Sequence, residues 1–214
     1  MIIAIDGPAA SGKTTVARGL ARALGLVFLD TGAMYRAVAL AVLRRGVDPG
    51  DGEACARVAG ALELGFDAQG RVLIDGLPGE PEVRSPQVDA LVSAVSAHPG
   101  VRAAIVPIQR RLARAGAVAE GRDTGSVVFP AADHKFFLRA SAAERARRRA
   151  LQQGRPELEG EIRVGLERRD HLDSTRADSP LALAPGAEVI DTDGLDAEQV
   201  VALLLERVRA GSQP

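Results

Sequence analysis

The pattern of apolar positions begins with a strand, a turn and a helix. Residues 2–6, "IIAID", form an apolar run that meets a glycine-rich turn. From Lys13 onward, Val16, Leu20 and Leu24 fall on one helical face, and Gly25 ends the pattern. The segment therefore predicts a strand, a loop and a helix in that order.

Four more runs along the chain are apolar on both faces. They are "LVFLD" at 26–30, "GAVAEG" at 116–121, "HKFFL" at 134–138 and "AEVID" at 187–191. Such runs, separated by helical stretches, are typical of buried parallel strands with crossover helices. We therefore expect a three-layer α/β fold built on a five-stranded parallel sheet.

Two long intervals do not fit a simple crossover. Between about residues 38 and 115, the stretch "ELGFDAQGRVLIDGLPGEPEV" alternates apolar and polar residues around glycines and prolines, which predicts a small antiparallel hairpin structure in an inserted subdomain. After the run at 134–138, an arginine-rich helical segment is broken by Gly-Arg-Pro. Two excursions from one core predict two mobile lobes that flank a cleft.

The composition restricts where a charged partner can bind. The formal net charge of −1 disfavours bulk attraction to nucleic acid or to an anionic membrane surface, so any anion site must be local. Lys13 and Lys135 are the only lysines, and arginine supplies the rest of the positive charge. Arginine pairs bidentately with phosphate, but the codon bias of a GC-rich genome explains the high arginine content equally well.

Features of secretion and of membrane insertion are missing from the sequence. Cys55 is the only cysteine, which excludes an intramolecular disulfide and a zinc cluster of cysteines. The apolar part of the N-terminus is too short for a signal peptide, and no later stretch approaches the length of a membrane helix. We expect a cytoplasmic protein that binds neither nucleic acid nor a membrane.

The segment "GPAASGKT", Gly7 to Thr14, matches the phosphate-loop pattern G-x-x-x-x-G-K-[ST]. Its glycines let backbone N–H groups surround an anion, and the start of the next helix adds a partial positive charge. Lys13 would reach the terminal phosphates, and the Thr14 hydroxyl would bind Mg²⁺. A chance match is the alternative, although the strand before and the helix after are the expected context.

A phosphate loop is shared by motors, switches, regulators and kinases. The guanine-reading element Asn-Lys-x-Asp cannot exist in a chain without asparagine, so a GTP switch is disfavoured. The remaining classes must be separated by what lies elsewhere at the carboxyl ends of the strands, where ligands of parallel sheets gather.

The segment "LDTGAMYRA" begins at such a carboxyl end. Arg36, at the start of the following helix, can clamp a phosphate, and the ring of Tyr35 can lie against a base or a sugar. The alternative, in which Tyr35 packs in a hinge and Arg36 is solvated, fits the periodicity equally well.

The apolar run at 116–121 leads into "EGRDTGSVVFP", which again lies at the carboxyl end of a predicted strand. Arg122 would hold a phosphate there while Asp123 accepts from an amine or a hydroxyl, although an ordinary ion pair is the commoner arrangement. Farther on, Arg169, Asp173 and Arg176 are spaced for one face of a helix. That spacing by itself favours a surface ladder of ion pairs.

In this order and spacing, "GPAASGKTT", "LDTGAMYRA", "VAEGRDTGSVVFP" and "RRDHLDSTRADSPL" resemble the bacterial cytidylate kinase family. The similarity runs nearly end to end and includes "EVRSPQVDALVSAVSAHPGVR" in the inserted region. The resemblance implies a P-loop kinase fold and transfer of a phosphoryl group from ATP, with Mg²⁺, to CMP or dCMP by a monomer.

The resemblance also implies roles for individual residues. Those expected to bind ATP are Gly7, Pro8, Ala9, Ala10, Ser11, Gly12, Lys13, Thr14 and Thr15. Those expected to bind CMP are Arg36 and Arg122 at the phosphate with Tyr35 near it, Ser93, Arg110 and Asp123 at the cytosine, Arg169, Asp173 and Arg176 at the sugar and the transferred group, and also Thr31. The residues expected to be catalytic are Lys13, Arg122 and Arg176.

The same resemblance divides the chain into a core, an insertion and a lid. The core would comprise 1–37, 111–143 and 166–214, with a monophosphate-binding insertion at about 38–110 and a short helical lid at about 144–165. Which of Arg145, Arg147, Arg148 and Arg149 reaches ATP stays open. The chain departs from the family's pattern at Thr31, where a serine is frequent, and at Glu120, where an aspartate is familiar.

Phosphoryl transfer depends on alignment and charge neutralisation more than on covalent chemistry by the protein. The acceptor oxygen of CMP is already anionic, so no catalytic role is expected for His98, His134 or His171. Two other functions remain open at this point. One is a nucleotide-dependent switch or regulatory module, and the other is a kinase for another acceptor such as UMP, shikimate or dephospho-coenzyme A.

Overall fold

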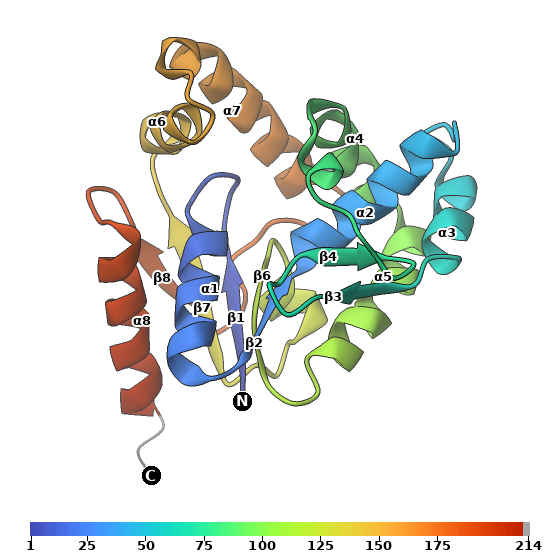
Figure 1. The fold of residues 1–214 in the computed structure, drawn as a ribbon. Helices are drawn as coiled ribbons and strands as arrows, with labels where there is room; N and C mark the ends of the chain where they lie inside the picture. Colours follow the sequence, from blue (N-terminus) through green and yellow to red (C-terminus); the bar gives the residue numbers. More distant parts are fainter. Residues whose placement is uncertain (212–214) are drawn as a thin grey trace. The chain divides into compact units, whose positions relative to one another are not determined.

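The computed structural model describes residues 1–211, which contain a five-stranded and a three-stranded sheet with their helices (Figure 1). The strand order in the larger sheet is β2-β6-β1-β7-β8. Strand β1 pairs in parallel with β6 and β7, and β7 pairs in parallel with β8. The bounds are β1 Ile2–Asp6, β2 Val27–Asp30, β6 Ala117–Gly121, β7 His134–Arg139 and β8 Glu188–Asp191. These are the five apolar runs, so the predicted α/β sheet is confirmed, although in the edge strand β8 only Ile190 is buried.

The chain divides into two compact units. Unit 1 comprises Met1–Phe28, Ala115–Thr175 and the residues from Pro180 onward. Unit 2 comprises Leu29–Arg114 and Arg176–Ser179.

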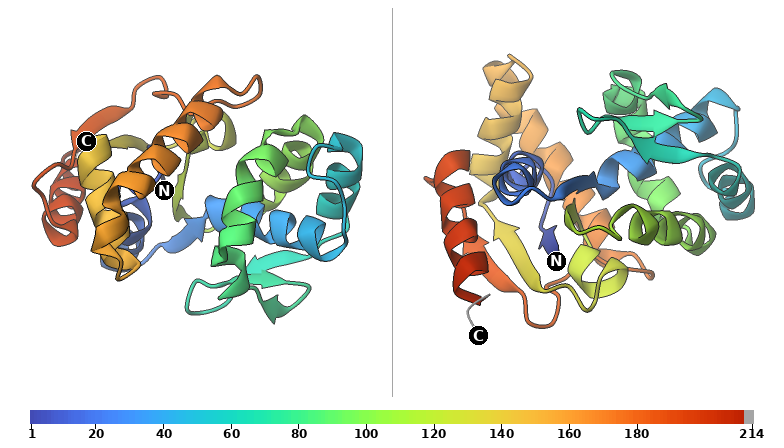
Figure 2. Two further views of the ribbon diagram at one scale, coloured as in Figure 1. Left: turned by 90° about the horizontal axis from the view of Figure 1, so that it is seen from above. Right: turned by 60° about the horizontal axis from the view of Figure 1, so that its bottom comes forward.

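One face of the sheet in unit 1 is covered by α1 (Lys13–Leu24) and α8 (Ala197–Gly211) (Figures 1 and 2). The two helices pack against each other, and a side chain at Gly19 of α1 would meet Val201 of α8. Their apolar stripes meet strand residues in one buried core, formed around Ile3, Ile5, Val16, Leu20, Leu138, Ile190, Val200 and Leu204. The predicted helix after the phosphate loop is thus confirmed, and its buried stripe fixes the loop at the carboxyl end of β1.

Unit 2 contains five helical segments and a small antiparallel sheet. The helices are α2 (Thr31–Arg44), α3 (Gly52–Gly60), η1 (Glu82–Arg84), α4 (Pro86–Ala97) and α5 (Pro99–Leu112), and the strands are β3 (Leu64–Phe66), β4 (Val72–Ile74) and β5 (Leu77–Pro78). Helix α2 starts where it does because the side chain of Asp30 accepts a hydrogen bond of 2.7 Å from the Ala33 amide. The hairpin predicted from alternation around glycines is confirmed as the sheet β3-β4-β5.

The arginine-rich segment of unit 1 forms α6 (Ala142–Gln152), the 3₁₀ turn η3 (Pro156–Leu158) and α7 (Glu159–Thr175). The break between the two helices falls at Gly154, whose φ of 66° is in the left-handed region. This confirms the predicted helical segment with an interruption at Gly-Arg-Pro. In addition, a five-residue π-helical turn, η2 (Thr124–Val128), follows β6.

One expectation about α7 is wrong. Arg176 does not share a helical face with Arg169 and Asp173, because α7 ends at Thr175. In the last turn, the hydroxyls of Ser174 and Thr175 both donate to the His171 carbonyl, at 3.1 and 2.7 Å, and such local bonds compete with helix continuation. Arg176 instead donates from Nε to the Ser179 carbonyl at 2.6 Å within the short segment that belongs to unit 2.

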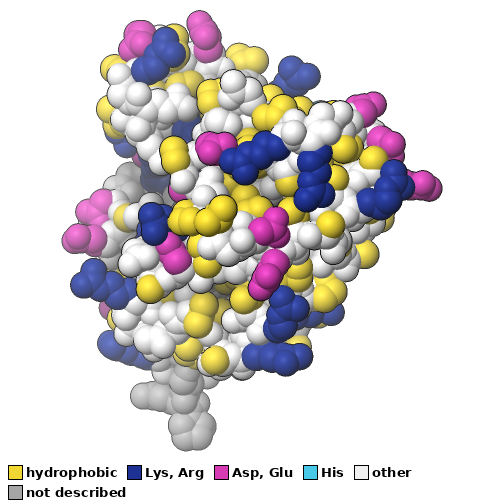
Figure 3. Space-filling model, turned by 45° about the vertical axis from the view of Figure 1, so that its right-hand side comes forward, with side chains coloured by type: hydrophobic (Ala, Val, Ile, Leu, Met, Phe, Trp, Pro, Cys, Tyr) yellow, Lys and Arg dark blue, Asp and Glu magenta, His cyan; other side chains and the backbone are white. Residues whose placement is uncertain are grey.

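The surface carries mixed charge. Figure 3 shows Lys and Arg side chains interspersed with Asp and Glu over the face that it draws, as the net charge of −1 leads one to expect. Within residues 1–211, no single helix is long and apolar enough to cross a membrane, although α4 and α5 reach that length and composition together across a bend of 96°.

Candidate nucleotide-binding site

The phosphate loop of unit 1 runs from the end of β1 to the start of α1. Gly7 has a φ of 150°, and a side chain there would overlap the carbonyl oxygen of Leu138. Gly12, with a φ of 89°, lies immediately before the first residue of α1. Both backbone conformations favour glycine, so the two glycines of the motif are required by this turn and not only by a ligand.

Lys13 is folded back over the loop. Its Nζ donates to the Pro8 carbonyl at 2.6 Å and to Ser11 Oγ at 3.4 Å, and the residue is buried. Burial lowers the pKa of Lys13 to about 7, and the positive charge of Arg122 adds to this shift, while Glu120 opposes it. A phosphate in the loop would supply the negative charge that favours the ammonium form.

Thr14 and Glu120 form the candidate metal-binding site. The Thr14 hydroxyl donates to Glu120 Oε1 at 2.5 Å, which brings together two hard oxygen ligands of the kind that Mg²⁺ prefers. Among residues 1–211, no group of three or more His, Cys, Asp or Glu side chains is arranged to hold a metal. A site with one carboxylate and one hydroxyl suits Mg²⁺, because Mg²⁺ usually keeps several waters and takes further oxygens from substrate phosphates.

Asp6 fixes the chain segment that follows Glu120. Its carboxylate accepts from the amides of Thr124 and Gly125 at 2.8 and 2.7 Å, and the residue is 2% exposed. Burial raises the pKa of Asp6, and the two backbone hydrogen bonds oppose that shift. Asp6 therefore ties the end of β1 to η2.

The loop is also held by the helices α6 and α7. Asp170 of α7 accepts from the Ala9 amide at 3.0 Å and pairs with Arg145 of α6, whose Nη1 also donates to the Ala9 carbonyl at 3.2 Å. Ala9 packs with Ala146 and Leu166 in a small apolar cluster. Of the α6 arginines that the sequence left open for ATP, Arg145 thus hydrogen-bonds to the backbone of the phosphate loop.

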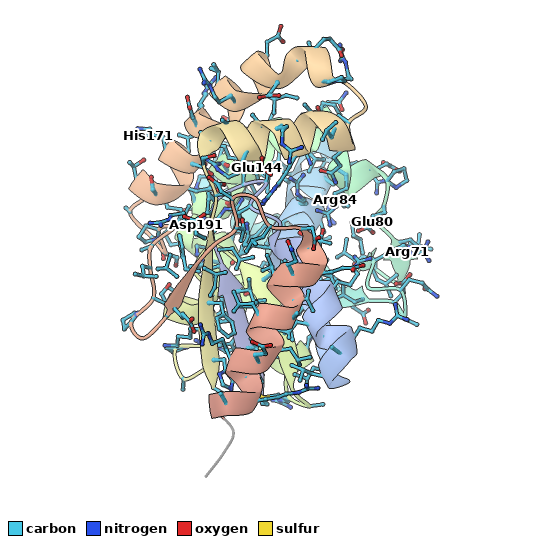
Figure 4. All side chains as sticks on the ribbon, turned by 90° about the vertical axis from the view of Figure 1, so that its left-hand side faces the viewer. Arg71, Glu80, Arg84, Glu144, His171 and Asp191 are labelled. Carbon is cyan, nitrogen blue, oxygen red and sulfur yellow. The ribbon has the colours of Figure 1, made fainter. Side chains whose placement is uncertain are left out.

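The other arginines of α6 have different partners. Arg148 donates to Glu144 and to the Thr192 carbonyl, at 2.8 and 2.5 Å, while Arg147 pairs with Glu144 on the exposed side. The hydrogen bond from Arg147, followed by that from Arg148, lowers the pKa of Glu144 to about 2. Figure 4 labels Glu144 on α6 and shows it apart from the exposed His171 of α7.

Three of the residues predicted for the acceptor converge in unit 1. Arg122 Nε donates to Asp173 Oδ2 at 3.0 Å, and Arg169 Nε lies 4.0 Å from the same oxygen. The Asp173 side chain is 6% exposed, so it serves as the shared counter-ion of two arginines. Spacing alone favoured a surface ladder of ion pairs along α7. The structure instead has a largely buried ion-pair cluster, which Arg122 joins from the segment after β6.

Arg36, the predicted phosphate clamp of unit 2, belongs to α2 and is buried. Its Nη2 pairs with Asp89 Oδ1 at 2.5 Å, and its Nη1 donates to the Val83 carbonyl at 3.2 Å. Arg84, next along η1, pairs with Asp30 at 2.7 Å and is labelled in Figure 4. These contacts rule out the solvated Arg36 that the periodicity left open.

Tyr35 is 6% exposed, and the guanidinium of Arg102 lies over its ring, 5.2 Å from the centroid. Arg102 is itself 3% exposed and its Nε lies 3.9 Å from Asp178 Oδ1. Arg110, which the sequence singled out on the same helix, is exposed. Sequence reasoning missed Arg102, although its spacing with the apolar positions 101 and 105 of α5 marks it as facing inward.

The remaining predicted residues are distributed over both units. Unit 1 contains Gly7 to Thr15, Arg122, Asp123, Arg169 and Asp173. Unit 2 contains Thr31, Tyr35, Arg36, Ser93, Arg110 and Arg176. Asp123 and Thr31 are buried and Ser93 is half-buried. His98 contacts the Pro49 carbonyl through Nε2, and His134 stacks on Phe136, so both have partners within their own units.

Comparison with known proteins identifies the family. The family model described as cytidylate kinase matches residues 3–210. The chain belongs to the cytidylate kinase family. It is 47% identical over 221 residues to a cytidylate kinase of Mycolicibacterium paratuberculosis, covering 100% of this chain and 97% of that protein. It is 46% identical over 217 residues to a cytidylate kinase of Pelotomaculum thermopropionicum, covering 98% and 96%.

A third relative of the cytidylate kinase family is longer. The bifunctional pantoate ligase/cytidylate kinase of Parasynechococcus marenigrum is 47% identical over 218 residues, which covers 98% of this chain but 44% of that protein. The family resemblance drawn from the four sequence motifs is confirmed by these matches.

Proposed function

We propose that this protein transfers the γ-phosphoryl group of ATP to CMP or dCMP and so produces ADP with CDP or dCDP. The observation that carries the proposal is the match of the cytidylate kinase family over residues 3–210. The phosphate loop of unit 1, the half-buried Arg122 of unit 1 and the buried Arg36 of unit 2 support it, because they supply cationic groups for two phosphorylated substrates.

The donor is proposed to bind at the phosphate loop. The backbone N–H groups of Gly7 and of Ala9 to Thr15, together with the Nζ of Lys13, would hold its phosphates, and Arg145 of α6 is hydrogen-bonded to the loop backbone at Ala9. Thr14 would ligate Mg²⁺, with Glu120 beside it. When bound, Mg²⁺ would neutralise charge on the phosphate oxygens of ATP.

The acceptor is proposed to bind through the arginine pairs. Arg36 and Arg122 would take its phosphate, and Arg169, Asp173 and Arg176 its sugar and the transferred group. For the base, the buried stack of Arg102 on Tyr35 supports Arg102 ahead of the exposed Arg110, with Ser93 and Asp123 as further contacts. Thr31 is proposed as a further contact of the acceptor. Residues 38–110 would then serve the acceptor and residues 144–165 would form a lid.

The reaction forms one bond and breaks one. An oxygen of the CMP phosphate attacks the γ-phosphorus of ATP while the bond from that phosphorus to the β–γ bridging oxygen breaks. The attacking oxygen is already deprotonated, so no side chain needs to act as a strong base. Lys13, Arg122 and Arg176 are proposed to neutralise the charge that spreads over the moving group.

A panel of acceptors tests the proposal. ADP release from ATP and Mg²⁺ is measured with CMP, dCMP, UMP and AMP in turn, and CMP or dCMP is expected to give the highest kcat/KM. Turnover of AMP equal to that of CMP would contradict the base assignment. Slow ATP hydrolysis that ignores every monophosphate would instead favour a switch or a regulatory module.

A further inference from the structure

Asp89 holds the arginine that is proposed to receive the acceptor's phosphate. Its Oδ1 lies 2.5 Å from Nη2 of Arg36, and it comes from the first turn of α4, which packs beside α2 (Figures 1 and 2). We propose that Asp89 sets the affinity for the acceptor by occupying Arg36 in the free protein and competing with the phosphate. This inference rests on the function proposed above.

A buried guanidinium needs a counter-charge when no ligand is bound. The Arg36 side chain is 9% exposed, and leaving such a group without a partner is strongly unfavourable. Asp89 provides the negative charge, and the Val83 carbonyl accepts from Nη1 at 3.2 Å. Since these two acceptors engage two of the five N–H donors of a guanidinium, Arg36 keeps donors for a phosphate.

The arrival of a phosphate dianion changes the balance at Arg36. Two anions then share one cation, and at the reduced effective dielectric of a largely buried site their mutual repulsion is substantial. Asp89 is the partner that can leave, because its side chain is 26% exposed against 9% for Arg36. The free energy spent on releasing Asp89 is subtracted from the binding of the acceptor, so the carboxylate weakens that binding.

A purely structural role for Asp89 makes a different prediction. An acidic side chain in the first turn of a helix is stabilising, and the ion pair also ties α4 to α2. In that case the loss of the charge would lower the free energy of unfolding and would leave the affinity for the acceptor unchanged or weaker. Competition predicts instead that loss of the Asp89 charge makes the acceptor bind more tightly.

The test compares Asp89→Asn with Glu82→Gln. The first variant removes the carboxylate charge but keeps a side-chain acceptor for Arg36. The second removes the same charge from an exposed pair in the same unit, in which Glu82 and Arg44 are 60% and 55% exposed. For each variant the KM values for CMP and for ATP are measured, together with the dissociation constants of CMP and of cytidine and the unfolding temperature.

Asp89→Asn is expected to lower the KM and the dissociation constant for CMP by about threefold to tenfold, with the KM for ATP and the affinity for cytidine within twofold of the wild type. Glu82→Gln is expected to change none of these values. If Asp89→Asn does not fold, Asp89→Ser carries the same comparison.

Two results would overturn the inference. One is an unchanged or increased KM for CMP in the Asp89 variant, which would assign Asp89 to the structure or to the positioning of Arg36. The other is an equal gain in affinity for cytidine, because that nucleoside carries no phosphate to compete with. A wild-type protein that turns over no CMP would refute the proposed function itself, which is a separate outcome.

Discussion

The carboxylate of Glu120 accepts a hydrogen bond of 2.5 Å from the hydroxyl of Thr14, a residue 106 positions away in the chain. Thr14 belongs to the first turn of α1 and Glu120 to β6, the strand that pairs with β1. The parallel pairing of β1 with β6 brings the end of β6 beside the phosphate loop. The carboxylate of Glu120, at the end of β6, therefore lies beside Thr14, the last residue of the loop motif.

Glu120→Gln is expected to weaken the response to Mg²⁺, because an amide is a poorer ligand than a carboxylate and carries no charge. The Mg²⁺ concentration that gives half-maximal rate is expected to rise by about tenfold or more. Initial rates measured against Mg²⁺ at fixed ATP and CMP check this. Glu161→Gln, on the exposed side of α7, is the control, and equal Mg²⁺ dependence in the two variants would contradict the assignment.

ATP binding is expected to take up a proton at pH 8. The pKa of Lys13 is lowered to about 7 in the free protein, so the side chain is mostly neutral at pH 8, and the phosphates of ATP then favour its charged form. Calorimetry in buffers of different ionisation enthalpy should report an uptake that approaches one proton per site. At pH 6 Lys13 is already mostly protonated, so the uptake should be small. In Lys13→Arg the side chain stays charged at both pH values, so proton uptake on ATP binding should no longer differ between pH 8 and pH 6. An unchanged difference in proton uptake would show that another group takes up the proton.

Gly7→Ala is expected to disrupt the loop, since the added methyl group would overlap the Leu138 carbonyl oxygen at a φ of 150°. We expect a loss of more than about 2 kcal/mol in the free energy of unfolding, together with loss of ATP binding. Gly25→Ala is the matched control: its φ is 65°, but nothing lies within 4 Å of the added atom. That variant should lose about 1 kcal/mol and keep ATP binding. Urea unfolding and nucleotide titration distinguish the two, and similar losses in both would contradict the steric argument.

Asp170→Asn should destabilise unit 1 by leaving Arg145 without its charged partner. The Arg145 side chain is 8% exposed, so we expect a loss of about 2–4 kcal/mol in the free energy of unfolding. Glu167→Gln, in the same helix, removes an exposed pair with Arg163 at 3.9 Å and should cost less than about 0.5 kcal/mol. Equal midpoints of urea unfolding for the two variants would show that the contact of Asp170 with the loop carries no stability.

Arg102 is expected to matter more than Arg110 for the acceptor. Arg102→Lys keeps the charge but loses the planar group over Tyr35, and we expect its KM for CMP to rise by about tenfold, with little change in the KM for ATP. Arg110→Lys, at an exposed position of α5, should stay within twofold. The unfolding temperatures of both variants separate this effect from lost folding. A larger effect at Arg110 would restore the assignment made from the sequence.

Local patterns were enough to predict the framework of the fold. The alternation around the glycines of residues 63–83 and the stripe of Val16, Leu20 and Leu24 each depend on neighbouring positions, and both gave the correct elements. The end of α7 was mispredicted because spacing alone carries Arg176 onto the helix. The hydroxyl bonds of Ser174 and Thr175 to a backbone carbonyl oppose that continuation and are invisible in a hydrophobic pattern.

The sequence by itself determined the phosphate loop, the five strands of the larger sheet and the family, because each of these depends on residue types at short and regular spacing. Only the tertiary structure decided the partners of the charged groups: Glu120 for Thr14, Asp170 for Arg145, Asp89 for Arg36 and Tyr35 for Arg102. The physical reason is burial. A guanidinium or carboxylate that leaves water must find a counter-charge or a hydrogen bond, and which one it finds depends on how distant elements pack.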